Sequence, residues 1–83
     1  MKLQVLYFAW LRERIGQGRE VVETEAATVA DLIAELRLRD ERYDLAFSDM
    51  SAIRCAVDQT LAPPQTPLAG VREVAFFPPM TGG

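Results

Sequence analysis

The last eight residues of the chain, Phe-Phe-Pro-Pro-Met-Thr-Gly-Gly, combine three residue types that could present a reactive group. Each proline fixes its own φ and favours extended geometry in the residue before it, so Pro78 and Pro79 should direct the chain away from a folded domain. At about 3.3 Å per residue, the segment from Pro78 to Gly83 could project roughly 20 Å. Gly82 and Gly83 would then offer a backbone thin enough for a narrow channel, with a carboxylate at its tip. The alternative is a frayed end, since chain termini are often disordered.

A carboxylate on Gly83 would be ionised at neutral pH, and this anion is a poor acyl electrophile. Transfer of an adenylyl group from ATP would give a mixed anhydride, from which a sulfur or nitrogen nucleophile could displace AMP. The chain has no histidine and one cysteine, and we expect Cys55 to be a small core residue inside a strand. We therefore expect partner proteins to supply the catalytic groups and to use the ATP, with no cofactor or metal bound to this chain.

The composition sets further bounds on function. Eighty-three residues suffice for one domain with one core and leave little room for a large catalytic cleft. A net charge of −3 and a pI near 4.8 argue against nucleic acid as the main ligand, because phosphate contacts need clustered basic residues. No apolar run approaches the ~20 residues of a membrane span, and the first residues lack the layout of a signal peptide. The single cysteine fits a reducing compartment, so we expect a cytoplasmic protein.

Apolar patterning predicts five strands and one long helix. The strands are expected at residues 2–9, 19–25, 52–57, 60–61 and 73–77. Thr28 begins the helix as its N-cap, with Asp31 in the first turn. Helical spacing gives this helix one apolar face, which consists of Val29, Leu32, Ile33 and Leu36.

Three shorter segments connect these elements. Residues 10–15 could make a helical turn that Gly16-Gln17-Gly18 closes, because glycine tolerates positive φ. Residues 40–49 suggest a loop or a short helical turn, packed by Tyr43, Leu45 and Phe47. The pair Asp58-Gln59 predicts a tight turn between two strands.

This order of strands and helix predicts an α+β protein with the β-grasp, or ubiquitin-like, fold. Such a fold has a mixed five-stranded sheet with one main helix packed on one face. Its first and last strands lie side by side and parallel at the centre, which fits the two most apolar strands here. We expect this domain at residues 1–77 and an extended, flexible tail at residues 78–83.

Two pairs of neighbouring aromatic residues should be divided between the faces of the sheet. Successive side chains of a strand point to opposite faces, so Tyr7 and Phe76 are expected in the core while Phe8 and Phe77 point outward. With Leu61 beside them, these outward aromatics would form a patch for a partner protein. The alternative is that the loop around residues 40–50 covers them.

The end of the long helix is rich in charge. Arg37, Arg39 and Arg42 complement the helix dipole and could also meet acidic groups on a partner. The acidic residues at positions 40, 41, 44 and 49 lack the spacing and the glycine turn of a calcium loop, so we expect a solvated loop there.

Several stretches together resemble the small subunit of molybdopterin synthase, the sulfur-carrier family of molybdenum-cofactor biosynthesis. They are Val5–Ala9, Leu11–Glu13, Thr28–Val29, Ala56–Leu61, Pro67–Leu68 and Glu73–Gly83. The last of these stretches is the specific part, whereas the others would support only a ubiquitin-like domain. Two departures concern turns: Ala69 and Val71 replace acidic residues beside a glycine, and Asp58 stands where asparagine is common.

The resemblance implies a role for each part of the tail. An adenylating enzyme related to ubiquitin activators would use ATP to load Gly83, which sulfur from a donor protein converts to a thiocarboxylate. The segment Pro78, Pro79, Met80, Thr81 and Gly82 would lie in the active site of the large synthase subunit. There Gly83 would give sulfur to cyclic pyranopterin monophosphate. The residues that contact the large subunit of this heterotetramer would be Phe8, Leu61 and Phe77, and the small subunit would not itself be catalytic.

Three other functions remain open from the sequence. The related sulfur carrier of thiamine biosynthesis also ends in Gly-Gly, although the Phe-Phe-Pro-Pro-x-Thr-Gly-Gly ending favours the molybdopterin family. A ubiquitin-like modifier would be conjugated to lysines through the same terminus. A plain protein-binding domain would have an inert tail.

Overall fold

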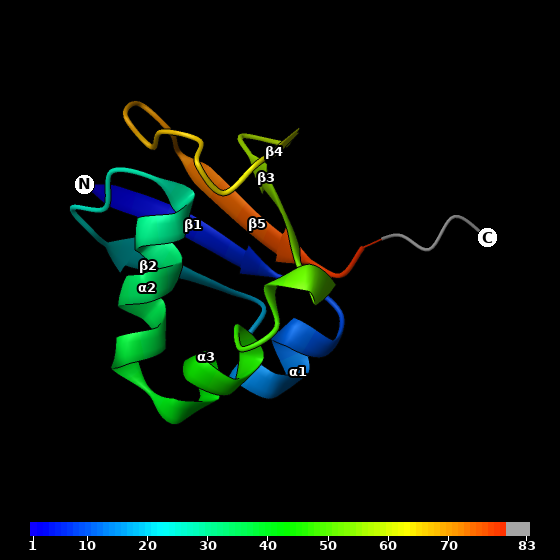
Figure 1. Ribbon diagram of the computed structural model, residues 1–83. Helices are drawn as coiled ribbons and strands as arrows, with labels where there is room; N and C mark the ends of the chain where they lie inside the picture. Colours follow the sequence, from blue (N-terminus) through cyan, green and yellow to red (C-terminus); the bar gives the residue numbers. More distant parts are fainter. Residues whose placement is uncertain (80–83) are drawn as a thin grey trace.

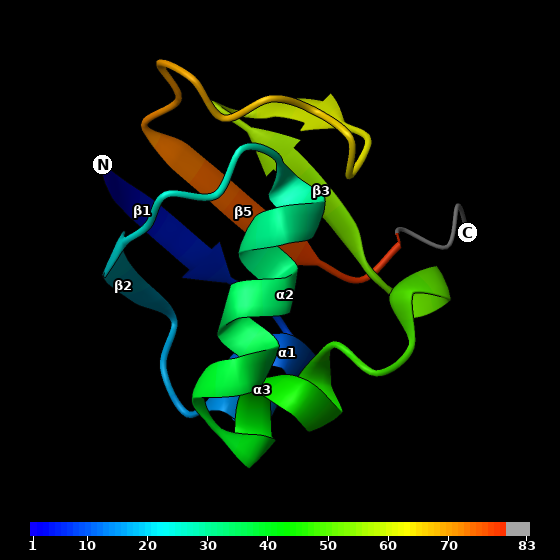
Figure 2. The ribbon, with the colours of Figure 1, turned by 60° about the vertical axis from the view of Figure 1, so that its left-hand side comes forward.

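The structure is a computed structural model that describes residues 1–79, and residues 80–83 lie outside the described part. Five strands form one sheet, and the helices lie on one side of it or at its end (Figures 1 and 2). In chain order the elements are β1 (Lys2–Tyr7), α1 (Trp10–Ile15), β2 (Arg19–Glu23), α2 (Val29–Arg39), α3 (Glu41–Ala46), the 3-10 helix η1 (Met50–Ala52), β3 (Arg54–Val57), β4 (Thr60–Ala62) and β5 (Glu73–Phe77). Within residues 1–79, no helix has both the length and the apolar character needed to cross a membrane.

The strand order across the sheet is β2-β1-β5-β3-β4. The two strands β1 and β5 pair in parallel, while β2 pairs antiparallel with β1 and the strand β3 pairs antiparallel with both β4 and β5. A parallel pair needs a long crossover connection, and here that connection contains α2. This topology confirms the predicted α+β class and the β-grasp arrangement with its parallel central pair.

The helix α2 begins where the sequence predicts. The Thr28 side chain accepts a hydrogen bond from the backbone N–H of Asp31, at 3.2 Å, and so caps the first turn. All four residues of the predicted apolar face are buried. Burial of each such aliphatic side chain contributes about 1.5–3 kcal/mol, which holds the helix against the sheet.

The face of the sheet under α2 carries the core. Tyr7 and Phe76 are both fully buried there, as predicted from strand alternation. The Phe76 ring makes an edge contact with Phe47, at 5.0 Å between ring centroids, and stacks beside Tyr7 at 6.2 Å. The residue Phe47 therefore fixes the segment after α3 against the central strand.

The segment at residues 40–49 differs in part from the prediction. It forms α3, in which Tyr43 is buried, and Phe47 follows one turn later on the same side. Leu45 was predicted to pack inward, and this prediction is wrong, because the side chain is 56% exposed. Side chains two residues apart in a helix point to nearly opposite faces. Tyr43 and Leu45 therefore cannot both face the core.

Some strand bounds also differ from those predicted. The strand β1 ends at Tyr7 because Ala9 has a φ of 55°, which is left-handed backbone. The strand β3 begins at Arg54 and not at Ala52, because Asp49 caps η1 by accepting a hydrogen bond from the Ser51 backbone N–H. The second strand ends at Glu23.

The turn between β3 and β4 has a second role. Asp58 and Gln59 both have positive φ, at 48° and 71°, as the tight turn of a hairpin requires. The Asp58 carboxylate accepts hydrogen bonds from the backbone N–H groups of Arg72 and Glu73, at 3.0 and 2.9 Å. Through these two hydrogen bonds, the Asp58 side chain in the turn holds the first residue of β5 in place.

A carboxylate joins β2 to α2, to α3 and to β1. Glu20 accepts hydrogen bonds from the hydroxyls of Tyr7 and Tyr43, at 2.8 and 2.7 Å, and from the Arg39 guanidinium at 3.0 Å. Its side chain is only 13% exposed, so these partners replace most of its contact with water. Buried carboxylates are tolerated when they are paired and hydrogen-bonded in this way.

The first prediction concerns this carboxylate. Glu20→Gln removes the charge next to Arg39 and replaces one acceptor oxygen by a donor, so we expect the free energy of unfolding to fall by about 2 kcal/mol. Urea unfolding followed by circular dichroism measures this change. The matched control is Glu23→Gln on the same strand, whose exposed side chain should change stability by less than about 0.5 kcal/mol. Equal effects of the two substitutions would contradict the structural role of Glu20.

The second prediction concerns alkaline pH. Burial, and next the hydrogen bond to Glu20, raise the pKa of Tyr7 far above its ordinary value of 10.0. The unfolded chain ionises this phenol near pH 10 and the folded chain does not, so the stabilisation is complete below pH 10 and is lost as pH rises further. Above pH 10, the stability of the wild type should fall more steeply than that of Tyr7→Phe, by about 1.4 kcal/mol per pH unit. Urea unfolding midpoints that change with pH by the same amount in the two proteins, between pH 8 and pH 11, would contradict this.

Candidate functional site

The tail predicted to carry the chemistry starts at the centre of the sheet. The strand β5 lies between β1 and β3, and Pro78 and Pro79 follow its last residue, both half-buried. The other predicted tail residues, Met80, Thr81, Gly82 and Gly83, lie outside the described residues. The described part therefore defines the surface from which the tail starts.

The face of the sheet opposite α2 is open. No helix among residues 1–79 lies over it in either view (Figures 1 and 2). Strand pairing defines one row of side chains on this face, because paired residues of neighbouring strands point the same way. The row runs through Arg19, Leu6, Ala75, Ala56 and Leu61. Its centre is apolar, and its two alanines keep it shallow.

The three residues predicted to contact a partner lie on or beside this row. Phe8 is 48% exposed and Leu61 is 68% exposed, while Phe77 is half-buried. The Phe8 backbone N–H donates to the Phe76 carbonyl at 3.0 Å, which brings Phe8 to the end of β5, beside Phe77. The open-face patch, as we call Leu6, Phe8, Ala56, Leu61, Ala75 and Phe77, is thus one surface at the start of the tail.

Within the described residues, the aromatic side chains of the segment around residues 40–50 do not cover Phe8 and Phe77. Of the residues in the segment 40–50, Tyr43 and Phe47 are buried in the core, where Phe47 packs on Phe76. They are therefore directed to the other face of the sheet. The role of Phe8, Leu61 and Phe77 in partner binding stays a prediction.

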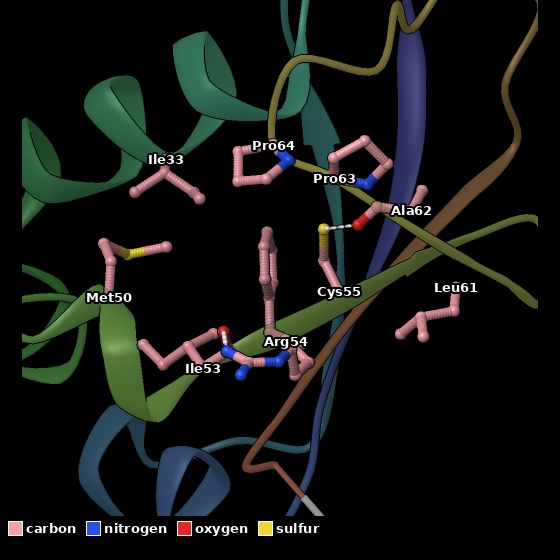
Figure 3. A pocket seen from close by; sticks show the side chains of 10 residues that line it. Ile33, Met50, Ile53, Arg54, Cys55, Leu61, Ala62, Pro63 and Pro64 are labelled. Carbon is pink, nitrogen blue, oxygen red and sulfur yellow. Dashed lines mark hydrogen bonds between the residues drawn. The ribbon is translucent and has the colours of Figure 1, made fainter.

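Cys55 is a core residue, as predicted. It is buried, and its thiol donates a hydrogen bond to the Ala62 carbonyl at 3.0 Å (Figure 3). Burial raises the pKa of the Cys55 thiol above its ordinary value. A thiol that resists ionisation is a poor nucleophile, so Cys55 does not fit a catalytic role.

A cavity of about 460 Å³ lies beside Cys55, between α2 and the β3–β4 hairpin (Figure 3). Its walls are mostly apolar and include Ile33, Met50 and Pro64, with Leu61 and Arg54 also among the lining residues. Sequence patterning did not predict this cavity, because the hairpin and η1 that bound it are brought together only by the fold. It adjoins the open-face patch through Leu61.

The acidic residues near α3 have structural roles. Asp40 caps α3 by accepting from the Arg42 backbone N–H at 2.8 Å, and its side-chain hydrogen bond from Arg42 holds the pKa of the carboxyl below its ordinary value. Asp44 accepts from Arg37 at 2.8 Å. Across residues 1–79, no three histidine, cysteine, aspartate or glutamate side chains gather as metal ligands.

The arginines near α3 are therefore committed within the chain. Arg37, Arg39 and Arg42 were expected to complement the helix dipole and were given a possible second role with acidic groups on a partner. Each makes an ion pair with an acidic residue of this chain. Other arginines lie at the open face: Arg19 is in its central row, and Arg54 pairs in register with Phe77. Strand alternation alone could have placed these two on that face, since Arg19 and Arg54 precede the inward-facing Glu20 and Cys55.

Comparisons with known proteins agree with this fold. In sequence, the ThiS family model matches residues 5–83. The chain is 40% identical over 81 residues to the molybdopterin synthase sulfur carrier subunit of Escherichia coli K12, covering 98% of this chain and 99% of that protein. It is 35% identical over 85 residues to the protein of the same name from Mycobacterium tuberculosis, covering 100% and 99%.

Solved structures give the same result for the fold. A putative molybdopterin converting factor, subunit 1, from Pyrococcus furiosus superposes with a TM-score of 0.73 and 27% identity, over 96% of this chain and 99% of that one. SAMP1 from Haloferax volcanii superposes with a TM-score of 0.75 over the whole of both chains, at 24% identity, and shows the fold alone. The β-grasp domain, its open face and the full-length sequence matches lead to one conclusion: this chain belongs to the ThiS family and, within it, to the molybdopterin synthase sulfur carrier subunits.

Proposed function

We propose that this chain is the sulfur-carrying small subunit of a molybdopterin synthase, with Gly83 as the residue that bears the sulfur. The observation that carries the proposal is the identity of 35–40% to three proteins named molybdopterin synthase sulfur carrier subunit, each aligned over nearly its full length. The family match extends through the tail to residue 83, so the segment required for the chemistry is part of the resemblance.

The proposed chemistry begins with activation of the Gly83 carboxylate. A carboxylate oxygen attacks the α-phosphorus of ATP in a partner adenylyltransferase, which releases pyrophosphate and leaves an acyl adenylate. Attack of a hydrosulfide sulfur, supplied by a donor protein, on the acyl carbon then expels AMP and leaves a thiocarboxylate. Dividing the substitution in this way replaces a very poor leaving group by a good one.

The described domain supports a passive role in these steps. The chain has no histidine, and its one thiol is buried, with a raised pKa. General bases and nucleophiles for acyl transfer must therefore come from the partners. The chain contributes the acyl group and the surface that positions it.

The open-face patch supplies that surface in this proposal. The patch lies at the carboxyl end of β5, and Pro78 follows directly. Docking of Phe8, Leu61 and Phe77 on the large subunit would therefore fix the starting point of the tail, and the two prolines would limit the directions that it can take. The tail could then deliver the thiocarboxylate to cyclic pyranopterin monophosphate bound in the large subunit.

The third prediction tests the chemistry at Gly83. Deletion of Gly83 should abolish sulfur transfer by the reconstituted synthase, because the shortened tail ends one residue before the reacting position. Intact-mass analysis of the wild-type protein from its native cell should show exchange of one oxygen for sulfur. Isopeptide adducts to lysines would instead indicate a modifier, and thiocarboxylate transfer to a thiazole precursor would indicate the thiamine carrier. Full synthase activity of the truncated protein would falsify the proposal.

The fourth prediction tests the patch. Phe77→Ala should weaken binding to the large subunit by about 1 kcal/mol or more, because aromatic anchors at the centre of an interface carry much of the binding energy. Isothermal titration calorimetry measures the affinity. Leu38→Ala is the control, since Leu38 is an apolar residue of α2 that is 89% exposed, away from the sheet. Equal affinities of the two variants would remove Phe77 from the binding surface.

A further inference from the structure

We infer that the partner surface covering the open-face patch is acidic around an apolar centre, and that Arg12, Arg19 and Arg54 steer the partner onto it. The inference rests on the proposed function, because it specifies the chemistry of the protein that receives this face. It concerns these three arginines and not the aromatic residues between them.

Six of the arginines fall into two groups. Those near α3 are neutralised internally: Arg37 pairs with Asp44 at 2.8 Å, Arg39 with Glu20 at 3.0 Å and Arg42 with Asp40 at 3.2 Å. By contrast, within residues 1–79 no carboxylate oxygen lies within ion-pair distance of Arg12, Arg19 or Arg54. All three are exposed. The internal pairs thus involve arginines of α2 and α3, whereas Arg12, Arg19 and Arg54 have no carboxylate partner among the described residues.

Two of the free arginines share a hollow at one end of the patch. Arg12 and Arg19 line it together with Leu6 and Phe8, in a volume of about 410 Å³. The floor includes Gly18, where a methyl group would lie only 3.2 Å from the Arg12 Nε. The absence of a side chain at Gly18 therefore lets the Arg12 guanidinium lie close to the backbone beside Arg19.

The third arginine lies on the other side of the patch. Arg54 pairs in register with Phe77 and, like Leu61, is one of the residues that line the cavity next to Cys55 (Figure 3). Its Nη1 donates to the carbonyls of Ile53 and Ser51, at 3.1 and 3.5 Å, which leaves further donors of the guanidinium for a partner. Cations thus bracket the patch from both sides.

The remaining charges near this face do not cancel them. In the paired register of the open face, Glu73 pairs with Gln4 at the opposite end of β5 from Phe77, and Glu23 pairs with Lys2. The Glu23 carboxylate lies 3.8 Å from the amino terminus. Arg19 donates to the Gln4 amide oxygen at 3.0 Å, which is a neutral partner. The face is therefore locally positive although the whole chain carries a net charge of −3.

This distribution of charge favours a partner whose surface is negatively charged. An apolar centre buries well against any complementary protein, but a basic rim attracts carboxylates and repels a second basic surface, including another copy of this face. Electrostatic steering of this kind raises association rates by about tenfold or more, and the gain falls with ionic strength. A large subunit with carboxylates around an apolar depression fits the face.

The test compares two double variants that change the net charge equally. Arg19→Gln with Arg54→Gln removes two rim charges, and Arg37→Gln with Arg42→Gln removes two charges of the helical side. Stopped-flow association with the purified large subunit at low salt should slow about tenfold for the rim pair and less than about twofold for the control pair. The difference should shrink as sodium chloride approaches about 0.5 M, where the Debye length falls to roughly half its physiological value of about 8 Å.

A third variant separates charge from side-chain shape. Arg19→Lys with Arg54→Lys keeps both positive charges and should associate at close to the wild-type rate. Equal slowing by the rim and control pairs, or rates independent of salt, would overturn the inference while leaving the proposed function intact. Failure of the wild-type chain to bind the large subunit would overturn both. Sedimentation provides one more check. If the carrier forms a dimer that the rim substitutions strengthen, the face serves self-association and the inference is overturned.

Discussion

The parallel pairing of β1 with β5 is the constraint on which the rest of this structure depends. It brings the start and the end of the domain together at the centre of one sheet, in the register Val5 to Val74 and Tyr7 to Phe76. A parallel pair cannot be closed by a tight turn, so the chain between these strands has to pass over the sheet. That passage supplies α2 and, with it, the larger part of the core.

The same register divides the aromatic residues between two functions. Because side chains alternate along a strand, Tyr7 and Phe76 point under α2 while Phe77 points away from it. A slip of one residue would exchange these positions and would place the core residues on the open face. The stability of the domain and the composition of its docking surface are therefore set by a single alignment of two strands.

Much of this could be predicted from local sequence. The Thr28 cap, the apolar face of α2, the Asp58-Gln59 turn and the inward position of Tyr7 each depend on residues close together in the chain. The partners of Glu20 and the commitment of Arg39 could not be predicted, because they join β2 to α2 and α3 across long separations. Leu45 was misplaced for a related reason: an apolar residue in a charged segment was taken as inward, and only the helical phase of α3 shows that it is not.

The position of β5 has a consequence for how the protein is made. This strand fills the space between the β1–β2 pair and the β3–β4 hairpin, yet it is the last of the described strands to leave the ribosome. Until it arrives, each of these two strand pairs has an unpaired edge facing the other, and such edges readily associate with other chains. Closing the sheet also requires contacts between residues far apart in sequence, which form slowly. Folding thus waits for the strand that leads into the tail, so a nascent chain interrupted before Phe77 lacks the central strand of its sheet and cannot present a complete docking face.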